Sequence, residues 1–462
     1  MFEKSRRGLN LIYLTVVITL IIWLGSKFYY GDYFLEWQKY PAKASSLSAI
    51  ILICWTVILS TRIRVIEKLF GGLDKVYKAH RKIGKLSFLL ILLHPLFLAA
   101  RYLPNLNNFF GNLWLMPNDN TYMIGHNVGL LTIIFMIILI ILSVYIKIPY
   151  NIWKKTHEYF GLVILLTVIH ILLVDKDVAA YPLLGIWVYG FLILAMWSVL
   201  YIQYFYPWFG PRYTYEVDCL EFVDKNIEIT LIPRDKSMLF KPGQFVYIKF
   251  VNKDIYSEVH PYSIAYAQED DGTIKLGIKQ LGDHTRTLTK LQNGDRVILW
   301  GPYGQFSERF LTTHQDCVFV GGGIGITPFL GMWDYKLSMP MTKPKVRFYY
   351  VVNDINEASF DNDIKKIAIK NQFNGQKSFQ KHSHHYEVYE KNKLGYINAD
   401  YISKNLKTIK GSLYFLCGPK PMTDALIRGL KEKGVPNSHI ITEDFEILSY
   451  PKRQTFKDWL KF

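Results

Sequence analysis

Long apolar runs fill the first part of the chain, and short apolar runs separated by polar turns fill the rest. The change comes at about Tyr206. Since about 20 consecutive apolar residues cross a bilayer as a helix, each long run is near the required length. The pattern predicts six membrane helices within residues 1–208, at 9–26, 45–61, 83–103, 125–147, 158–175 and 183–206. The second run is short and is interrupted by Ser and Thr.

The first run follows Lys4, Arg6 and Arg7, as the apolar segment of a signal peptide does. No small-residue cleavage site comes after it, so we expect this run to stay in the protein as a membrane anchor.

Lys and Arg are unevenly divided between the two sets of loops that join these helices. One set holds 14 of them and the other holds 5: Lys4, Arg6, Arg7, Arg62, Arg64, Lys68, Lys75, Lys78, Arg81, Lys82, Lys85, Lys147, Lys154 and Lys155, against Lys27, Lys39, Lys43, Arg101 and Lys176. Cytoplasmic loops are the ones rich in basic residues. We therefore expect an integral protein of the cell membrane with its N-terminus and soluble part in the cytoplasm.

The overall charge narrows the range of partners. A net charge of +16 suits contact with anionic lipid headgroups. No nucleic-acid-binding fold or stripe of basic and aromatic residues accompanies it, so nucleic acid is not an expected partner. The four cysteines have neither disulfide-framework nor zinc spacing, which fits a reduced compartment.

The part after about Pro211 reads as two soluble domains. Five short strands are predicted at 213–221, 226–231, 244–250, 273–279 and 296–300, separated by turns such as Asp271-Gly272. They predict a small antiparallel β-barrel over residues 209–311. After Gln315 strands and helices alternate, which predicts an α/β nucleotide-binding domain over residues 312–462. Its first strand runs into a glycine-rich turn at 321–328, and such a turn before a helix offers backbone N–H groups to a pyrophosphate.

Four histidines fall on the third and fifth predicted membrane helices. His80 and His94 are 14 residues apart, and His157 and His170 are 13 apart. At about 1.5 Å per residue each pair spans roughly 20 Å of helix, which places two imidazoles at each of two depths. Ionisable groups in lipid are costly and tend to be functional, and neutral imidazole is a common haem ligand. We expect His80 with His157 to bind an inner haem iron, and His94 with His170 an outer one.

The spacing in the fifth helix resists this pairing. At 100° per residue, 14 residues return to within about 40° of the starting face, whereas 13 leave His170 about 140° away from the face of His157. A tightened 3₁₀ stretch, or approach of His157 from the helix entrance, would correct the difference.

Two other groups of histidines are expected to bind no metal. His126 begins the fourth helix without a partner and is expected to be structural or to line an outer substrate site. His382, His384 and His385 lie in a polar stretch that predicts a solvated loop.

Further motifs surround the glycine-rich turn. In chain order they are His-Pro-Tyr-Ser-Ile-Ala at 260–265, Gly-Asp-His-Thr-Arg-Thr-Leu at 282–288, Gly-Pro-Tyr-Gly at 301–304, Leu-Cys-Gly-Pro-Lys-Pro-Met at 416–422 and Glu-Asp-Phe at 443–445. This set resembles the ferredoxin–NADP reductase superfamily. His260 replaces the superfamily's arginine, as in the NADPH oxidase and ferric reductase family, which also has six membrane helices with paired haem histidines. The chain resembles a prokaryotic member of that family.

For the flavin, the resemblance implies six FAD-binding positions: His260, Pro261, Tyr262, Ser263, Gly282 and Thr285. Tyr262 would pack against the flavin ring and Ser263 would hydrogen-bond near its N5. His260 would contact the phosphate or ribityl region, and Gly282 and Thr285 would hold the pyrophosphate.

For the nucleotide, the resemblance implies seven positions that bind NADPH or NADH: Gly322, Gly323, Gly325, Thr327, Cys417, Gly418 and Pro419. Glu443 and Phe445 would lie near the flavin, with Phe445 covering the ring until nicotinamide displaces it. The residues implied to act in the chemistry itself are Ser263, Cys417, Glu443 and Phe445.

Two positions depart from the family. Asn353-Asp354 follows the predicted strand 345–352, where members that prefer NADPH often carry an arginine, so use of NADH stays open. Leu98 stands where animal oxidases have a second outer histidine, which weakens the case for oxygen as the dedicated acceptor.

The resemblance implies a transmembrane oxidoreductase that passes electrons from cytoplasmic NAD(P)H through FAD and two b-type haems to an outer acceptor. Oxygen, giving superoxide, and ferric iron are the expected acceptors. A quinone is an alternative acceptor. Another alternative is an electron-donating subunit that binds an extracytoplasmic redox protein through the outer loops. A haem-binding sensor is disfavoured by the intact flavin and nucleotide motifs.

Overall fold

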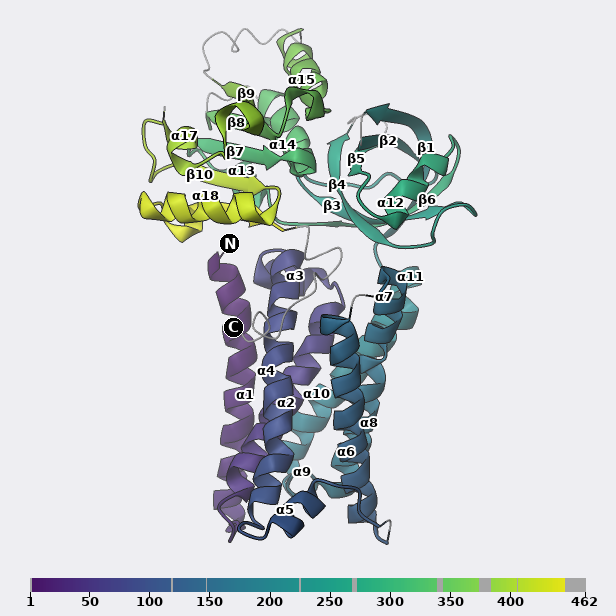
Figure 1. The fold of residues 1–462 in the computed structure, drawn as a ribbon, viewed down its shortest axis with the longest axis vertical. Helices are drawn as coiled ribbons and strands as arrows, with labels where there is room; N and C mark the ends of the chain where they lie inside the picture. Colours follow the sequence, from purple (N-terminus) through teal and green to yellow (C-terminus); the bar gives the residue numbers. More distant parts are fainter. Residues whose placement is uncertain are drawn as a thin grey trace. The chain divides into compact units, whose positions relative to one another are not determined.

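The computed structural model describes residues 2–117, 119–146, 148–223, 226–267, 272–338, 344–373, 384–404 and 406–444. They form two compact units, one built from most of residues 4–208 and the other from residues 209–444 (Figure 1). The first unit is helical, and the second combines a β-barrel with an α/β sheet.

The helical unit confirms the six predicted membrane helices within the described residues. The spans are α1 (Phe2–Tyr30), α2 (Lys39–Ser60), α4 (Leu73–Ala100), α6 with η1 (Thr121–Ile140, Ile141–Tyr145), α7 with α8 (Tyr150–Glu158, Phe160–Val174), and α10 with η2 and α11 (Pro182–Leu200, Tyr201–Phe205, Tyr206–Phe209). Three short helices lie between them: α3 (Arg64–Phe70), α5 (Leu106–Asn112) and α9 (Lys176–Ala180).

Helix α2 occupies the core of this unit. Its apolar window is 67% buried, compared with 17% for α4 and α6. Leu47 and Cys54 of α2 belong to one buried cluster with Trp23 of α1 and Leu184 of α10. Three of the polar residues that weakened the sequence pattern, Ser45, Ser48 and Thr61, are buried here, and Ser45 donates a hydrogen bond of 2.9 Å to its own helix backbone. A helix surrounded by other helices has no need of an unbroken lipid-facing surface.

The first part of the second unit is the predicted antiparallel barrel. Six strands close in the order β1-β2-β5-β4-β3-β6: β1 (Arg212–Val223), β2 (Asn226–Pro233), β3 (Phe245–Val251), β4 (His260–Ala267), β5 (Ile274–Lys279) and β6 (Arg296–Tyr303). Five were expected as strands, and β4, which carries the His-Pro-Tyr-Ser motif, is the sixth. Helix α12 (Asp283–Thr287) and η3 (Leu288–Lys290) connect β5 to β6.

The second part is the predicted α/β domain, built on a parallel five-stranded sheet. Its order is β11 (Ile440–Glu443), β10 (Leu413–Cys417), β7 (Cys317–Gly322), β8 (Val346–Val352) and β9 (His385–Glu390). The other elements are α13 (Glu308–Thr312), η4 (Gly323–Ile326), α14 (Thr327–Ser338), η5 (Ile355–Glu357), α15 (Asp361–Phe373), α16 (Lys391–Leu394), α17 (Ala399–Ser403), α18 (Lys420–Glu432) and η7 (Asn437–His439). One buried cluster joins one sheet face to α14 and α15, and another joins the opposite face to α17 and α18.

The strand order reverses between β7 and β10. The chain enters the sheet at β7, adds β8 and β9 on one side, and then returns to add β10 and β11 on the other. Such a switch point opens a crevice at the carboxyl ends of the two strands, where open α/β sheets bind ligands. The glycine-rich turn follows β7 at this place.

Barrel and sheet pack directly against each other within this unit. Asn226 of β2 donates a 2.6 Å hydrogen bond to Ser359, and Lys275 of β5 lies 3.4 Å from Asp363 of α15. A side chain on Gly331 of α14 would lie 3.6 Å from the carbonyl oxygen of Ala265 on β4. The flavin motif strand therefore lies against the helix that follows the glycine-rich turn.

Candidate functional site

The structure brings His80 and His157 together. Their ring centroids lie 6.1 Å apart, with 56° between the ring planes. Since a ligand nitrogen lies about 2 Å from its metal, two imidazoles on opposite faces of one haem iron hold their centroids roughly 6 Å apart. The residues present therefore fit an iron between them.

Hydrogen bonds orient three of the four membrane histidines in the same way. Nδ1 of His80 lies 2.8 Å from the Thr56 carbonyl oxygen, Nδ1 of His94 lies 2.8 Å from that of Ala42, and Nδ1 of His170 lies 2.8 Å from that of Gly125. A carbonyl oxygen only accepts, so each Nδ1 carries the hydrogen and each Nε2 presents a lone pair. This is the arrangement of a metal-ligating imidazole whose other nitrogen is held by the protein.

His157 is held differently. Its Nδ1 lies 3.3 Å from the Ser143 hydroxyl, and its ring stacks on Trp153 with centroids 5.2 Å apart. The Trp153 indole in turn donates a 3.1 Å hydrogen bond to the Ser143 carbonyl oxygen.

The 13-residue spacing coincides with a break in the fifth span. Helix α7 ends at Glu158, α8 begins at Phe160, and Tyr159 forms the turn between them. The backbone N–H of Tyr159 bonds to the Thr156 carbonyl, and that of Leu162 bonds to the Tyr159 carbonyl, both spanning three residues as in a 3₁₀ helix. Since a 3₁₀ residue turns about 120° instead of 100°, the break rotates His170 in the direction that the pairing requires.

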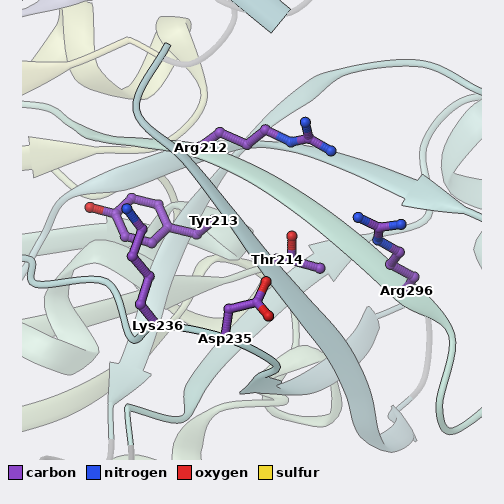
Figure 2. A pocket seen from close by; sticks show the side chains of 6 residues that line it. All are labelled: Arg212, Tyr213, Thr214, Asp235, Lys236 and Arg296. Atoms are coloured by element: carbon purple, nitrogen blue, oxygen red, sulfur yellow. The ribbon is translucent and has the colours of Figure 1, made fainter. Parts of the chain in front are cut away.

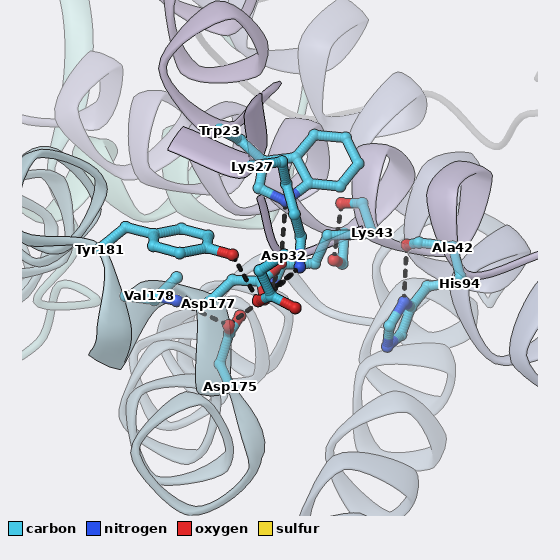
Figure 3. Close-up of polar contacts among 11 residues, drawn as sticks. Trp23, Lys27, Asp32, Ala42, Lys43, His94, Asp175, Asp177, Val178 and Tyr181 are labelled. Carbon is cyan, nitrogen blue, oxygen red and sulfur yellow. Dashed lines mark hydrogen bonds and ion pairs between the residues drawn. The ribbon is translucent and has the colours of Figure 1, made fainter. Parts of the chain in front are cut away.

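His94 lies beside a cluster of charged residues, most of them buried (Figure 3). Lys43 of α2 pairs with Asp175, which follows α8, and both side chains are at most 13% exposed. Lys27 lies 3.1 Å from Asp177, which also accepts a 2.8 Å hydrogen bond from the Trp23 indole. We name Trp23, Lys27, Asp32, Lys43, Asp175, Asp177 and Tyr181 the outer polar cluster.

Asp32 connects the outer polar cluster to solvent. Its side chain is 60% exposed, lies 3.2 Å from Lys27 Nζ and accepts a 2.6 Å hydrogen bond from the Tyr181 hydroxyl. The Tyr181 hydrogen bond and the Lys27 ammonium lower the pKa of Asp32, and burial together with Asp32 raises the pKa of Tyr181 to about 12.

Two other positions of the membrane helices, Gly129 and His126, also bear on the histidine sites. Gly129 of α6 lies against His170, and a Cβ there would come within 2.5 Å of the ring. His126 Nε2 lies 3.2 Å from the Trp114 carbonyl oxygen. A small residue such as Gly129 opposite His170 is a signal that the sequence offers for this contact. The carbonyl partners of the histidines belong to the backbone, so no residue type in the sequence marks them.

In the barrel, the motif residues of β4 pair with β3. Ser263 lies opposite Phe245 and His260 lies opposite Ile248. Ser263 is buried, and the buried hydroxyl of Tyr262 has no hydrogen-bond partner among the described residues. Burial raises the pKa of the Tyr262 phenol. The motif thus lies on a regular strand, with Pro261 at a position that pairs with Tyr247.

The residues expected to hold the flavin pyrophosphate lie at the start of α12. Thr285 Oγ1 accepts hydrogen bonds of 2.9 and 3.0 Å from the N–H groups of Leu281 and Gly282. No atom lies within 4 Å of a Cβ built on Gly282, so this turn is open. The His260 and His284 rings stack at 4.2 Å, which brings α12 against the start of β4.

In the sheet, the expected residues Cys417 and Glu443 lie beside Gly321 at the carboxyl ends of neighbouring strands. Cys417 of β10 pairs in register with Gly321 of β7 and with Glu443 of β11. Cys417 is buried, and burial together with Glu443 holds the pKa of its thiol well above the usual range. A Cβ on Gly304, which follows β6, would lie 3.3 Å from Glu443 Oε1, so this end of the sheet reaches the barrel.

The glycines of the two turns touch each other at the switch point. A Cβ on Gly325 would lie 2.7 Å from the Cys417 carbonyl oxygen, and one on Gly418 would lie 2.9 Å from the Gly322 Cα. Gly322 also lies against Pro419. Gly323 has a φ of +53° and open space around it, a conformation that favours glycine. Thr327 begins α14, whose N-terminal N–H groups suit a phosphate.

Other expected positions are distributed as follows. Phe445 and His382 lie outside the described residues. His385 begins β9, the edge strand of the sheet, instead of lying in the expected loop, and His384, just before that strand, accepts a 3.1 Å hydrogen bond at Nδ1 from the Val346 N–H. The Lys-, Gln- and Asn-rich sequence had hidden this strand.

The barrel also carries a cationic cleft of about 440 Å³ (Figure 2). Its lining residues are Arg212, Tyr213, Thr214, Asp235, Lys236 and Arg296. None of the residues expected to bind flavin or nucleotide lines this cleft.

Comparisons with known proteins agree with this layout. Three family descriptions match: "Ferric reductase like transmembrane component" over residues 45–168, "FAD-binding domain" over 214–307, and "Oxidoreductase NAD-binding domain" over 319–427. Both the membrane part and the soluble part of the chain are thus matched by oxidoreductase families.

Relatives resemble part of the chain. A subunit of the Na(+)-translocating NADH-quinone reductase of Marinomonas sp. (strain MWYL1) is 26% identical over 215 residues, which is 43% of this chain and 51% of that protein. Its counterpart in Actinobacillus pleuropneumoniae serotype 5b (strain L20) is 27% identical over the same shares. The chain therefore spans about half the length of these curated relatives. Among solved structures, the FAD/NAD-binding domain of a nitric oxide dioxygenase from Vibrio cholerae O1 biovar El Tor is 19% identical, with a TM-score of 0.41. The match covers 50% of this chain and 97% of that chain.

The membrane helices, the barrel and the parallel sheet occur in the order of those three families. Within the described residues the chain has six helices long and apolar enough to cross a membrane, and it matches, in order, a ferric reductase like transmembrane component, an FAD-binding domain and an oxidoreductase NAD-binding domain.

Proposed function

We propose that this protein carries electrons across the membrane, from cytoplasmic NAD(P)H through FAD and two b-type haems to an acceptor at the outer face. The observation that carries the proposal is the common orientation of the membrane histidines. His80, His94 and His170 each hold Nδ1 against a backbone carbonyl, which leaves Nε2 to face a metal. Three such imidazoles in one apolar bundle are expensive unless they have a ligand.

The positions of the histidines support two haems instead of one. His80 and His94 lie 14 residues apart on the single helix α4, a rise of roughly 20 Å. His157 lies at the inner pair and His170 follows it on α8. Axial imidazoles and burial are the features by which a protein sets a haem potential, so the proposed role of this bundle is mainly positioning.

The soluble unit supplies the proposed entry point for electrons. When bound, FAD accepts hydride from a reduced nicotinamide and releases electrons singly. In our proposal Tyr262 and Ser263 orient the flavin, and the turns around Gly325 and Gly418 hold the dinucleotide. The contact between Gly304 and Glu443 supports this arrangement, because it joins the barrel end to the crevice of the sheet.

Two observations guide the finer assignments. The basic loops support our proposal that the soluble unit lies in the cytoplasm. At the end of β8, Asp354 accepts a hydrogen bond from the Asn356 N–H. Glu357 accepts one from the Asn353 side chain, and Glu390 accepts one from the Ile355 N–H. Three carboxylates disfavour a 2′-phosphate, so we propose NADH as the preferred donor.

For the acceptor we propose oxygen or ferric iron. A quinone is the second candidate, because the curated relatives that match the chain are named as subunits of NADH-quinone reductases. An extracytoplasmic redox protein that docks on the outer loops is a further form of the same proposal. Comparing superoxide formation with reduction of a ferric chelate and of a soluble quinone distinguishes these acceptors.

Haem stoichiometry tests the proposal directly. The purified wild-type protein should hold two haems per chain. His94→Ala and His170→Ala should each leave the inner haem only, whereas His126→Ala, a matched histidine at the same end of the bundle, should retain both. Two haems in His94→Ala, or no haem in the wild type, would contradict the proposal.

A further inference from the structure

Three side chains that commonly bind metals meet where β4 begins. Glu258 lies in the preceding loop, His260 is the first residue of the strand, and His284 lies on α12. His260 Nε2 lies 2.7 Å from Glu258 Oε2, and the two histidine rings stack at 4.2 Å with 27° between their planes. One donor atom from each residue lies within 4.8 Å of the other two. Within the described residues, this is the one group of His, Cys, Asp and Glu that meets that condition.

His284 shows independently that a ligand belongs here. The residue is 6% exposed, and neither ring nitrogen makes a well-formed hydrogen bond with any residue that the structure describes. Buried polar atoms without partners are rare because each costs free energy. A neutral imidazole held in this way has a lone pair to donate to a metal.

The donor set selects the class of ligand. Two imidazole nitrogens with one carboxylate oxygen suit Zn²⁺ and similar transition ions, whereas Mg²⁺ and Ca²⁺ prefer oxygen donors alone. Glu258 and His260 are each 18% exposed, so an ion can enter from solvent. At position 260 an arginine has no lone pair to offer, and the histidine of this chain does.

We propose that Glu258, His260 and His284 form a Zn²⁺ site, with water completing the coordination, and that the metal competes with FAD. The competition rests on the proposed function, in which His260 contacts the flavin phosphate or ribityl region. When His260 binds the metal together with Glu258 and His284, its ring is held away from the flavin. Zinc would thereby oppose loading of the flavin.

Metal titration of the haem-loaded, flavin-free full chain tests the site. Co²⁺, which gives a visible spectrum in such sites, and Zn²⁺ should each bind at one ion per chain, and Mg²⁺ should not. His284→Asn should weaken Zn²⁺ binding by at least about tenfold, the usual minimum for loss of a group that supports a metal. If that variant does not fold, Glu258→Gln at the more exposed ligand serves the same purpose.

The control is His385→Gln. His385 and Glu387 form a pair with the same two-residue separation, at 3.0 Å, on β9. Zinc binding should be unchanged in this variant. Absence of stoichiometric binding in the wild type would overturn the site, as would binding that persists in both His284→Asn and Glu258→Gln.

FAD titration with and without Zn²⁺ tests the competition. With the metal at about ten times its Kd, the apparent Kd for FAD should rise about tenfold in the wild type and remain unchanged in Glu258→Gln. An unchanged Kd in the wild type would overturn the competition. Failure of FAD to bind without any metal would instead contradict the proposed function, and the metal titration would still decide whether the site exists.

Discussion

The imidazole of His94 is hydrogen-bonded to the backbone carbonyl of Ala42, at 2.8 Å from Nδ1 to oxygen. Ala42 directly precedes Lys43, whose ammonium pairs with Asp175 just beyond the helix that carries His170. The N-cap carboxylate of Asp175 also accepts a hydrogen bond from the Val178 N–H, which fixes its position. The Lys43–Asp175 pair therefore joins the helix that holds His94 through Ala42 to the end of the helix that carries His170.

Removing one member of this pair should loosen the outer site. In Lys43→Met, the carboxylate of Asp175 stays buried without its main counter-charge, a loss of about 3 kcal/mol of stability for pairs of this kind. The midpoint potential of the outer haem should shift, while the inner haem keeps its spectrum. Detergent unfolding and a redox titration measure both effects.

Lys39→Met is the control for that variant. Lys39 lies on the same helix as Lys43 and pairs at 3.4 Å with Glu36, which precedes that helix, but the two side chains are 34% and 45% exposed. Exposed pairs contribute about 0–1 kcal/mol, so stability and potentials should stay close to wild type. Equal effects of the two substitutions would show that Lys43 has no special role.

Nucleotide preference should respond to the carboxylates after β8. The variant Asn353→Arg with Asp354→Ser supplies a cation and removes an acid where the 2′-group of the ribose is expected. The ratio of kcat/KM for NADPH to that for NADH should rise by about tenfold or more, roughly 1.4 kcal/mol of transition-state binding. Asp400→Ser, an exposed acid on α17 that pairs with Lys433, should leave the ratio unchanged. A wild-type enzyme that already prefers NADPH would contradict the assignment.

Gly325→Ala should weaken use of the nucleotide without affecting haem content. Its methyl group would lie 2.7 Å from the Cys417 carbonyl oxygen, a clash with backbone that neither turn can avoid without moving. We expect at least about a tenfold loss of kcat/KM for NADH, since the two turns must separate by some tenths of an ångström. In Gly331→Ala, on α14, the new methyl meets only ordinary contacts at 3.6 Å and should be tolerated. Retained activity in Gly325→Ala would argue against a nucleotide site at this crevice.

The stability of the soluble unit should fall as the pH falls from about 6.5 to about 4. Burial depresses the pKa of His284 to about 4 in the folded state, below the ordinary value of 6.5. Between these values the unfolded chain binds the proton and the folded chain does not, so protonation favours unfolding. The contribution is at most about 3 kcal/mol. In His284→Gln this part of the pH dependence should disappear, and an unchanged slope would contradict the burial of a neutral imidazole. The measurement requires metal-free protein.

Periodicity and composition were enough to predict much of the architecture. The six helices, five of the barrel strands and the glycine-rich turn before α14 all follow from apolar runs and turn residues that act locally. Strand β4 was not predicted because Pro261 and the polar residues around it interrupt the apolar alternation. Its strand conformation depends on pairing with β3 and β5, and a local pattern does not contain that pairing.

The candidate sites show the same limit. Four histidines at matched depths can be found in the sequence, but the break at Tyr159 depends on local hydrogen bonds that no simple helical projection contains. The Lys43–Asp175 pair joins residues 132 positions apart, and the Trp23–Asp177 hydrogen bond joins residues 154 apart. Such partners are selected by helix packing, so a single sequence gives no signal for them.

The central claim is that electrons pass from nucleotide to membrane haem within this one chain. Anaerobic addition of NADH to the purified full-length protein, supplied with FAD, tests it most directly through the haem absorbance. We predict that both haems become reduced, and that omission of FAD prevents the reduction. Haems that stay oxidised with NADH and with NADPH, in the presence of bound FAD, would contradict the account.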